Sequence, residues 1–367
     1  MGTEVWFAPG RANLMGEHTD YNEGFVLPFA LAQGVTATAA ARDDRRLVLE
    51  SRQRPGEPVT LSLDSLEPRS VTGWAAYPAG VAWALRAAGL DLHGASVDID
   101  SDLPVGAGVS SSAALECSVA LALCSLSGLT VPRGELAAIA KRAENEFVGA
   151  PTGIIDQSAA LLCQADHAML LDCRTLTATQ VPFQPAAAGA VSLIVDTRVT
   201  HALVNGEYAA RRAECEEAAR LLGVPALGLV SDPAEVGRLA DPVLRRRARH
   251  VVTDSIRAQA IAAALQDTPA SDSYPLTGKL LTEGHASLRD DFEVSWPQAD
   301  AAVDAAIEAG AYGAKMIGGG FGGSVLALMP QEREQAVRAA LAECFAARGW
   351  TPPEFLEAVP GPAARRL

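Results

Sequence analysis

The sequence of 367 residues contains only three lysines, Lys141, Lys279 and Lys315, and this scarcity excludes a familiar phosphate-binding motif. A Walker loop requires Gly-Lys followed by Ser or Thr, whereas Gly278-Lys279 is followed by Leu280. The His-Arg-Asp and Asp-Phe-Gly motifs of protein kinases are also absent from the sequence. If this chain binds a nucleotide, it therefore belongs to neither of these two large classes.

Positive charge as a whole is in short supply. The chain has 30 Lys and Arg residues against 44 Asp and Glu residues, which gives a formal net charge of −14 at pH 7. The field of such a chain repels phosphate, so nucleic acid and anionic membrane surfaces are poor candidates as partners. A phosphate ligand would have to be held locally, by backbone amides, a metal ion and a few well-placed arginines.

Cysteine pairs, export signals and long apolar runs are missing too. The six cysteines show no Cys-x-x-Cys spacing, which argues against a metal site or a disulfide framework and favours free thiols in a reducing cytoplasm. The first residues lack the basic start and apolar run of a signal peptide. The most apolar window, 113–129, contains Glu116 and several serines, so it indicates a buried helix and not a membrane span. We therefore expect a cytoplasmic protein.

Predicted strands and helices come in runs along the chain without strict alternation, which is typical of an α+β protein. The length predicts two domains. The Pro- and Ala-rich stretch 181–189 is the best boundary, so we expect an N-terminal domain over 1–180 and a C-terminal domain over 190–367. Helices are predicted over 73–88, 110–124, 132–148, 206–222, 242–265, 275–288, 296–308 and 332–348. Strands are predicted over 4–8, 25–31, 35–41, 47–51, 59–63, 95–99, 191–196, 314–317 and 324–328.

The segment 103–114, Leu-Pro-Val-Gly-Ala-Gly-Val-Ser-Ser-Ser-Ala-Ala, has the composition of an anion-binding loop. Its glycines let the backbone approach a ligand closely, and its three serines open a helix whose free amides attract a negative charge. A dinucleotide fingerprint does not fit, because Ser111 stands where the third glycine is required. The segment predicts a polyphosphate site with one serine hydroxyl left for Mg²⁺, but an ordinary capped helix start explains it equally well at this point.

A second cluster of functional groups lies in 11–22, Arg-Ala-Asn-Leu-Met-Gly-Glu-His-Thr-Asp-Tyr-Asn. Glu17, His18 and Asp20 offer the acceptors and the imidazole that would bind a hydroxyl-rich ligand by directed hydrogen bonds. Arg11 follows a turn predicted at Pro9-Gly10, where its guanidinium could stabilise charge on a transferring phosphoryl group. A solvated polar loop and a surface ion pair are the alternatives for these two features.

Three separated segments, 10–28, 103–115 and 318–323 (Gly-Gly-Gly-Phe-Gly-Gly), together resemble the signature motifs of the GHMP small-molecule kinases. The first resembles the signature of the galactokinase family almost residue for residue, and the motifs occur in the correct order over nearly the whole chain. This resemblance implies an α+β fold with an N-terminal domain of ribosomal-protein type and a ferredoxin-like C-terminal domain. The active site would lie between them.

The resemblance implies galactokinase activity: transfer of the γ-phosphoryl group of ATP to the anomeric C1 hydroxyl of α-D-galactose. The products would be galactose 1-phosphate and ADP, at the entry to Leloir galactose metabolism, with Mg²⁺ as cofactor and a monomeric enzyme. A kinase for N-acetylgalactosamine or a related sugar stays open, because the pocket near C2 lies outside the motifs. A non-catalytic galactose sensor is disfavoured, because the chain keeps the Ser-Ala pair of the phosphate loop together with Asp156 and Arg11.

The resemblance also implies roles for individual residues. Asp156 would be the catalytic aspartate and Arg11 the arginine that stabilises the transition state. The expected sugar-binding residues are Glu17, His18, Asp20, Gly153 and Tyr208. The expected nucleotide-binding residues are Ser51, Trp74 (against the adenine), Gly106, Ala107, Gly108, Val109, Ser110, Ser111 and Ser112. Ser112 and Glu144 would bind Mg²⁺. Near the catalytic aspartate, Thr152 and Ile155 depart from the family's usual Cys and Met.

Overall fold

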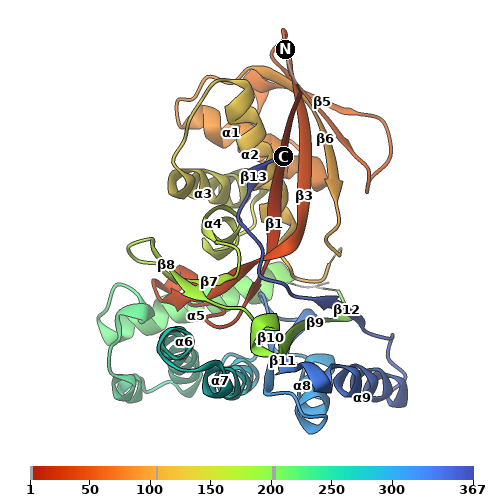
Figure 1. The fold of residues 1–367 in the computed structure, drawn as a ribbon. Coiled ribbons are helices and arrows are strands. Elements are labelled where there is room, and N and C mark those ends of the chain that lie inside the picture. Colours follow the sequence, from red (N-terminus) through yellow and green to blue (C-terminus); the bar gives the residue numbers. More distant parts are fainter. Residues whose placement is uncertain (1–2, 105, 201–203) are drawn as a thin grey trace.

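The computed structural model describes residues 3–104, 106–200 and 204–367. Within these residues, the first half of the chain is built on a six-stranded sheet of order β13-β1-β3-β6-β4-β5 (Figure 1). Its strands are β1 (Thr3–Asn13), β3 (Pro28–Arg42), β4 (Arg46–Ser51), β5 (Val59–Ser62), β6 (Gly94–Ser101) and β13 (Arg365–Arg366). Helices α1 (Ala76–Ala87), α2 (Ser111–Leu126), α3 (Arg133–Arg142) and α4 (Ile155–Leu162) lie beside this sheet and share one apolar core with it.

The second half is built on a four-stranded sheet of order β10-β11-β9-β12, counted over the described residues. It contains β9 (Ala190–Val199), β10 (Gly313–Ile317), β11 (Gly323–Pro330) and β12 (Glu354–Glu357). Its helices are α5 (Val204–Leu222), α6 (Pro242–Asp267), α7 (Ala270–Asp290), α8 (Pro297–Glu308) and α9 (Glu334–Ala347). A small sheet of β2 (Phe25–Val26), β7 (His167–Asp172) and β8 (Thr177–Pro182) lies between the two larger parts (Figure 1).

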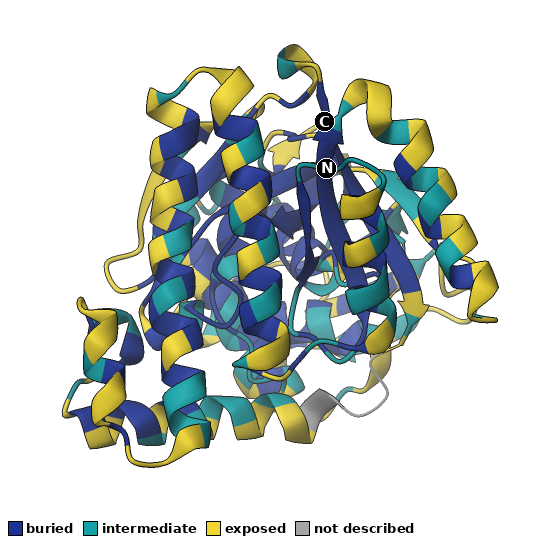
Figure 2. Ribbon diagram, turned by 90° about the horizontal axis from the view of Figure 1, so that it is seen from below, coloured by how far each residue is buried: buried dark blue, intermediate teal, exposed yellow. Residues whose placement is uncertain are grey.

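Successive side chains of β10 and β11 pack alternately into the cores of the two halves, and this explains how the halves meet. Ala314 and Met316 belong to the core of the second half, whereas Ile317 and Leu326 pack into the core of the first half. Since successive side chains of a strand point to opposite faces, both faces of this sheet are buried. Figure 2 shows the result: the helices are exposed along their outer stripes, and the strands inside are buried. Among the described residues, no helix has the length and apolarity needed to cross a bilayer.

The α+β architecture and the main helices agree with the sequence prediction. Helix α6, for example, begins where Asp241 caps it: its carboxylate accepts from Val243 N at 2.7 Å, and Pro242 occupies the first helical position. The predicted helix over 132–148 changes its form, because α3 ends at Arg142 and a π-helical turn (η4, Ala143–Val148) follows. The short helix α4, which contains Asp156, was not predicted.

The predicted turn at Pro9-Gly10 is wrong. Strand β1 continues from Thr3 to Asn13, and its pairing with β3 merely shifts register between Pro9 and Arg11. Proline has no backbone N–H to donate to the neighbouring strand, and a local shift of register accommodates the missing hydrogen bond. Arg11 therefore projects from a strand buried in the sheet and not from a surface loop, which gives its side chain a fixed origin.

The end of the described chain returns to its beginning. Trp6 pairs with Arg366 and Phe7 with Arg365, so β13 adds an edge strand next to β1. Arg366 also forms an ion pair with Glu4 at 2.9 Å. The six-stranded sheet thus contains residues from both ends of the sequence, while a division into domains near 181–189 stays a prediction.

Candidate active site

A cleft of about 460 Å³ lies where the two halves meet. The first half contributes β1 and the segment after it, the glycine loop before α2 and the start of α4. The second half contributes Tyr208 from α5 and two glycines that follow β10. The sequence-predicted residues that line this cleft are Arg11, Glu17, His18, Asp20, Gly106, Gly108, Val109, Ser110, Ser111, Ser112, Gly153, Asp156 and Tyr208. The fold therefore brings most of the predicted site together from four separate stretches of sequence, 11–20, 106–112, 153–156 and Tyr208.

Arg11 contacts both Asp156 and the glycine loop before α2. Its Nε donates to Asp156 Oδ1 at 2.8 Å, and its Nη1 donates to the carbonyl of Gly108 at 2.6 Å. The arginine side chain is 8% exposed and the aspartate 19%, so the pair is shielded from bulk water while the carboxylate still reaches the cleft. Asp156 lies in the first turn of α4. A guanidinium fixed between a carboxylate and a phosphate-type loop is placed to stabilise negative charge that develops between them.

Asp20 packs directly on Gly153. A Cβ atom added to Gly153 would lie 1.6 Å from Asp20 Oδ2, so no larger residue fits while Asp20 keeps its position. The carboxylate accepts from Tyr21 N at 3.0 Å and from Ile155 N at 3.4 Å. Burial, followed by the charge of Asp156, raises the pKa of Asp20. Its remaining lone pairs make Asp20 an acceptor for ligand hydroxyls.

His18 is held in a defined tautomer by groups from both halves. Its Nε2 lies 3.2 Å from the carbonyl oxygen of Gly319, which can only accept, so this nitrogen carries the proton. Its Nδ1 accepts from the Tyr21 hydroxyl at 2.9 Å. Burial, followed by the charge of His250, lowers the pKa of His18 to about 3. The ring is therefore neutral at ordinary pH and forms part of the wall of the cleft.

Helix α6 holds the segment that carries Glu17 and His18 through its backbone. Asp254 accepts from Gly16 N at 3.0 Å, and His250 Nε2 donates to the carbonyl of Glu17 at 3.0 Å. Both side chains have no exposed surface. These residues belong to no recognised motif, and the Asp254 contact spans 238 positions of sequence. No local sequence pattern distinguishes these two residues from other residues of α6.

The glycine loop before α2 does not behave as an ordinary capped helix start. Ser110 occupies the N-cap position with φ of 60°, and within the described residues its side chain makes no capping bond. The first amides of this 16-residue helix are thus available where the loop lines the cleft, which suits an anion. Ala107, unlike its neighbours, does not line the cleft: it is buried, and its carbonyl accepts from Ser324 Oγ at 2.6 Å. That bond ties the loop to the third glycine motif.

Ser112 and Glu144 place two hard oxygen ligands side by side. Ser112 Oγ donates to Glu144 Oε1 at 3.1 Å, while Thr152 Oγ1 and Gln157 Nε2 each donate to Glu144 Oε2 at 2.8 Å. The described residues contain no cluster of three or more His, Cys, Asp or Glu side chains that could hold a metal alone. Mg²⁺ commonly takes one or two protein oxygens and completes its shell with waters and phosphates. This donor pair therefore fits Mg²⁺ that arrives with a nucleotide.

Besides Ala107, two further predicted nucleotide contacts lie outside the lining of the cleft. Ser51 is the last residue of β4, and Trp74 packs against the core of the first half just before α1. Tyr77, one turn after Trp74, does line the cleft. The roles assigned to Ser51 and Trp74 stay predictions. Residues three apart lie on the same face of a helix, so the spacing of Trp74 and Tyr77 could have indicated Tyr77 as the alternative aromatic contact.

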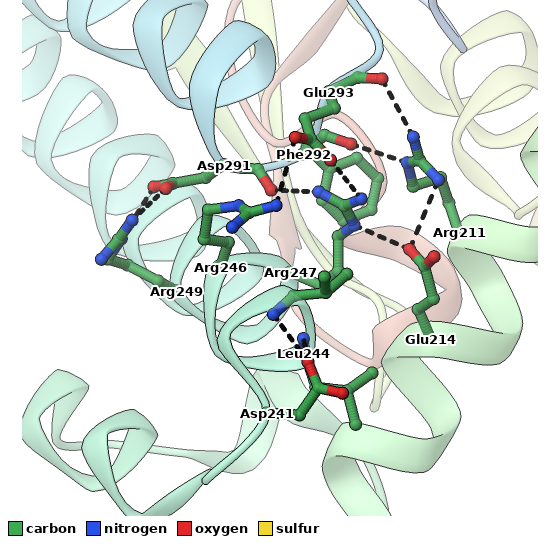
Figure 3. Close-up of polar contacts among 11 residues, drawn as sticks. Arg211, Glu214, Asp241, Leu244, Arg246, Arg247, Arg249, Asp291, Phe292 and Glu293 are labelled. Atoms are coloured by element: carbon green, nitrogen blue, oxygen red, sulfur yellow. Dashed lines mark hydrogen bonds and ion pairs between the residues drawn. The ribbon is translucent and has the colours of Figure 1, made fainter.

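A network of buried and half-buried charges positions the loop after α7 (Figure 3). Arg247, 2% exposed, donates to the carbonyl of Asp291 at 2.6 Å and pairs with Glu214 at 2.7 Å and with Glu293. The loop presents Phe292 to the site: its ring centroid lies 4.7 Å from that of His18 and 4.5 Å from that of His250. The network thus holds an aromatic ring against His18.

Comparisons with known proteins agree with this geometry. Residues 2–41 match the galactokinase galactose-binding signature, residues 76–164 the N-terminal domain of GHMP kinases and residues 258–347 their C-terminal domain. A galactokinase of Streptomyces coelicolor is 50% identical over 367 residues, which covers 99% of this chain and 94% of the relative. A galactokinase of Mycobacterium tuberculosis is 43% identical over 364 residues and covers 99% of both chains.

Solved structures give the same result at the level of the fold. The crystal structure of Lactococcus lactis galactokinase complexed with galactose matches with a TM-score of 0.94 at 33% identity, over 100% of this chain and 95% of that one. Mevalonate kinase of Methanococcus jannaschii matches with a TM-score of 0.67 at 16% identity, over 100% and 99% of the two chains, which is a likeness of fold alone. The similarity seen in three motifs therefore extends over the whole chain.

Proposed function

The chain belongs to the galactokinase family of GHMP kinases and is a sugar kinase, and we propose that the cleft residues divide the phosphorylation of galactose among them in the following way. Asp20, Glu17 and His18 bind the sugar between Gly153 and Tyr208. The loop Gly106–Ser112 binds the phosphates of ATP through backbone amides. Asp156 and Arg11 lie between the two substrates and act on the reacting atoms.

In the transfer step, the C1 hydroxyl oxygen of galactose forms a bond to the γ-phosphorus as the bond from that phosphorus to the bridging oxygen of ADP breaks. Asp156 accepts the hydroxyl proton or orients the hydroxyl, and in a loose transition state orientation counts at least as much as basicity. Arg11 stabilises the charge on the transferring group. Its hydrogen bonds to Asp156 and to the Gly108 carbonyl keep it in place before the substrates arrive.

Ser112 and Glu144 are the residues that would hold Mg²⁺. Thr152 and Gln157 hold the carboxylate in place by donating to its second oxygen. When bound, the ion neutralises phosphate charge that this strongly acidic chain would otherwise repel. Family membership also supports a monomeric cytoplasmic enzyme. Light scattering on the peak that elutes from a gel-filtration column would measure the oligomeric state.

The observation that carries the proposal is the placement of Arg11 between Asp156 and the glycine loop. This arrangement supports a kinase, because a sensor that binds sugar and ATP without transferring a phosphoryl group needs no arginine at the junction of its two ligands. A kinase for N-acetylgalactosamine is the second candidate, since none of the contacts described above defines the space around C2 of the sugar.

The test is a coupled assay of ADP release with ATP and Mg²⁺ against galactose, N-acetylgalactosamine, glucose, arabinose and mevalonate. We expect turnover with galactose well above the others. Preferred turnover of N-acetylgalactosamine would keep the roles of Asp156 and Arg11 but replace the substrate. Galactose binding in calorimetry with no turnover of any sugar would instead establish a sensor.

A further inference from the structure

Lys315 is a buried cation that the mechanism above does not use. It lies in β10 with no exposed surface, on the strand face opposite to Ala314 and Met316, which pack in the core of the second half. Its own face, shared with Ile317, is turned toward the first half. A lysine is almost never fully buried without a partner, so its contacts should explain why one of three lysines occupies this position.

The partner of Lys315 is Glu17, a residue of the sugar signature. The ammonium group forms an ion pair with Glu17 Oε2 and donates a hydrogen bond to the Met316 carbonyl at 3.0 Å. Glu17 is only 4% exposed, so the pair is shielded from water on both sides. Burial raises the pKa of Glu17, and the charge of Lys315 opposes that rise. Without the lysine, the buried carboxylate would lose the cation that offsets its burial most.

The same strand also fixes the next residue of the sugar signature. Two residues after β10 ends at Ile317, the carbonyl of Gly319 accepts from His18 Nε2 at 3.2 Å. Segment 315–319 thus contacts both Glu17 and His18, through a side chain in one case and the backbone in the other. Ser324 ties the third glycine motif to the phosphate loop. The same motif therefore also reaches the part of the cleft that Glu17 and His18 line, which we call the sugar end.

We propose that Lys315 is a positioning residue for sugar binding, which holds Glu17 as an oriented carboxylate so that it can accept hydrogen bonds from sugar hydroxyls. Lys315 acts through Glu17 and does not touch the substrate. The proposal rests on the proposed function in one respect, namely that Glu17 contributes to binding galactose. It assigns to β10, in the second half of the chain, an influence on sugar affinity that is exerted through Glu17.

Four variants test this: Lys315→Met, Lys315→Arg, Glu17→Gln and the double variant Lys315→Met/Glu17→Gln. Calorimetry measures the Kd of galactose and of ADP with Mg²⁺, and thermal unfolding shows which variants fold. We expect Lys315→Met to weaken galactose binding about tenfold or more and to change ADP binding less than about twofold. Lys315→Arg, which keeps the charge, should recover most of the affinity. Lys279→Met is the matched control, because the Lys279 side chain is 70% exposed and its Nζ lies 3.9 Å from Glu283 Oε1 in an exposed ion pair.

The double variant separates a positioning role from a merely structural one. If Lys315 acts through Glu17, adding Lys315→Met to Glu17→Gln changes galactose affinity less than about twofold, because the carboxylate is already gone. An equally large loss in both backgrounds would overturn the proposal, as would unchanged galactose binding by a folded Lys315→Met. If Lys315→Met does not fold, the comparison of the double variant with Glu17→Gln still decides. Unchanged galactose binding by Glu17→Gln alone would contradict the role given to Glu17 in the proposed function. This result differs from the two outcomes that would overturn the role of Lys315.

Discussion

At one end of the cleft, Glu17 and His18 are 4% and 5% exposed, and each contacts residues of the second half. At the other end, Gly106 and Ser111 are exposed, and a Cβ added to Gly106 would meet no atom within 4 Å. The sugar end is thus a closed arrangement of side chains, whereas the phosphate end is an open loop of backbone. The chemistry of the two ligands accounts for this difference.

A sugar presents neutral hydroxyls, and such groups are distinguished only by donors and acceptors whose directions are fixed in advance. A polyphosphate presents charge, which free amides and a cation attract over a range of geometries. Fixing side chains requires partners from distant parts of the chain, and this is why α6 and β10 reach the sugar end. Substitutions at the two ends should therefore have separable effects on sugar and nucleotide binding.

The largest effect is expected at the junction of the two ends. Asp156→Asn keeps an oxygen that accepts from Arg11 but removes the charge and the proton acceptor, so kcat should fall by about 10²- to 10⁴-fold. The Kd of galactose should change little, because the sugar-end contacts remain. Single-turnover kinetics and calorimetry measure the two quantities, and a variant with parental kcat would contradict the role of Asp156.

Arg11→Ala comes next and should affect both ends at once. Loss of the guanidinium removes charge stabilisation in the transition state and frees Asp156 and the Gly108 carbonyl, so we expect kcat to fall by about 10²-fold or more. Steady-state kinetics with both substrates varied provides the measurement. A change confined to KM would show that Arg11 serves binding alone.

Gly153→Ala sharpens the comparison by acting on the sugar end only. The new Cβ overlaps Asp20 Oδ2, so Asp20 must move, and galactose affinity should fall about tenfold or more while ADP affinity is kept. Gly106→Ala should do the reverse, and more weakly, since its φ of +82° is strained for alanine but the space is open. Gly134→Ala, within α3 and in open space, is the control that should leave both affinities unchanged. Equal losses of sugar and ADP affinity in Gly153→Ala would contradict the separation of the two ends.

The last prediction concerns stability and pH, and not the affinity of either end of the cleft. The folded protein holds the pKa of His18 at about 3, whereas the unfolded chain binds that proton near 6.5. Falling pH within this window therefore favours the unfolded state, by up to about 1.4 kcal/mol per pH unit for this one group. Between about pH 6 and pH 4, the free energy of unfolding should fall more steeply in the parent than in His18→Asn. Asparagine suits the site because it tolerates the φ of 63°. Equal slopes in urea titrations would show that His18 is not the group responsible.

The sequence predicted those parts of the site whose chemistry is local. The glycines and serines of 103–114 indicated a loop followed by a helix, and residues 106–110 do form a loop that leads into α2. The contacts of Glu17 with His250 and Lys315 were beyond prediction, because they join positions hundreds of residues apart without any periodic pattern. The helix around Asp156 was missed for another reason: α4 is only eight residues long, and Ile154 at its N-cap gives no capping signal.

Strand β13 has a consequence for how this chain is made. Its residues Arg365 and Arg366 pair with Phe7 and Trp6, so almost the entire described chain is synthesised between the two partners. At about 5–20 residues per second, β1 stays without this neighbour for roughly 20 to 70 s. An unpaired strand edge is a site at which chains associate wrongly. The nascent protein therefore carries an open sheet edge at residues 6–7 until residues 365–366 have been synthesised.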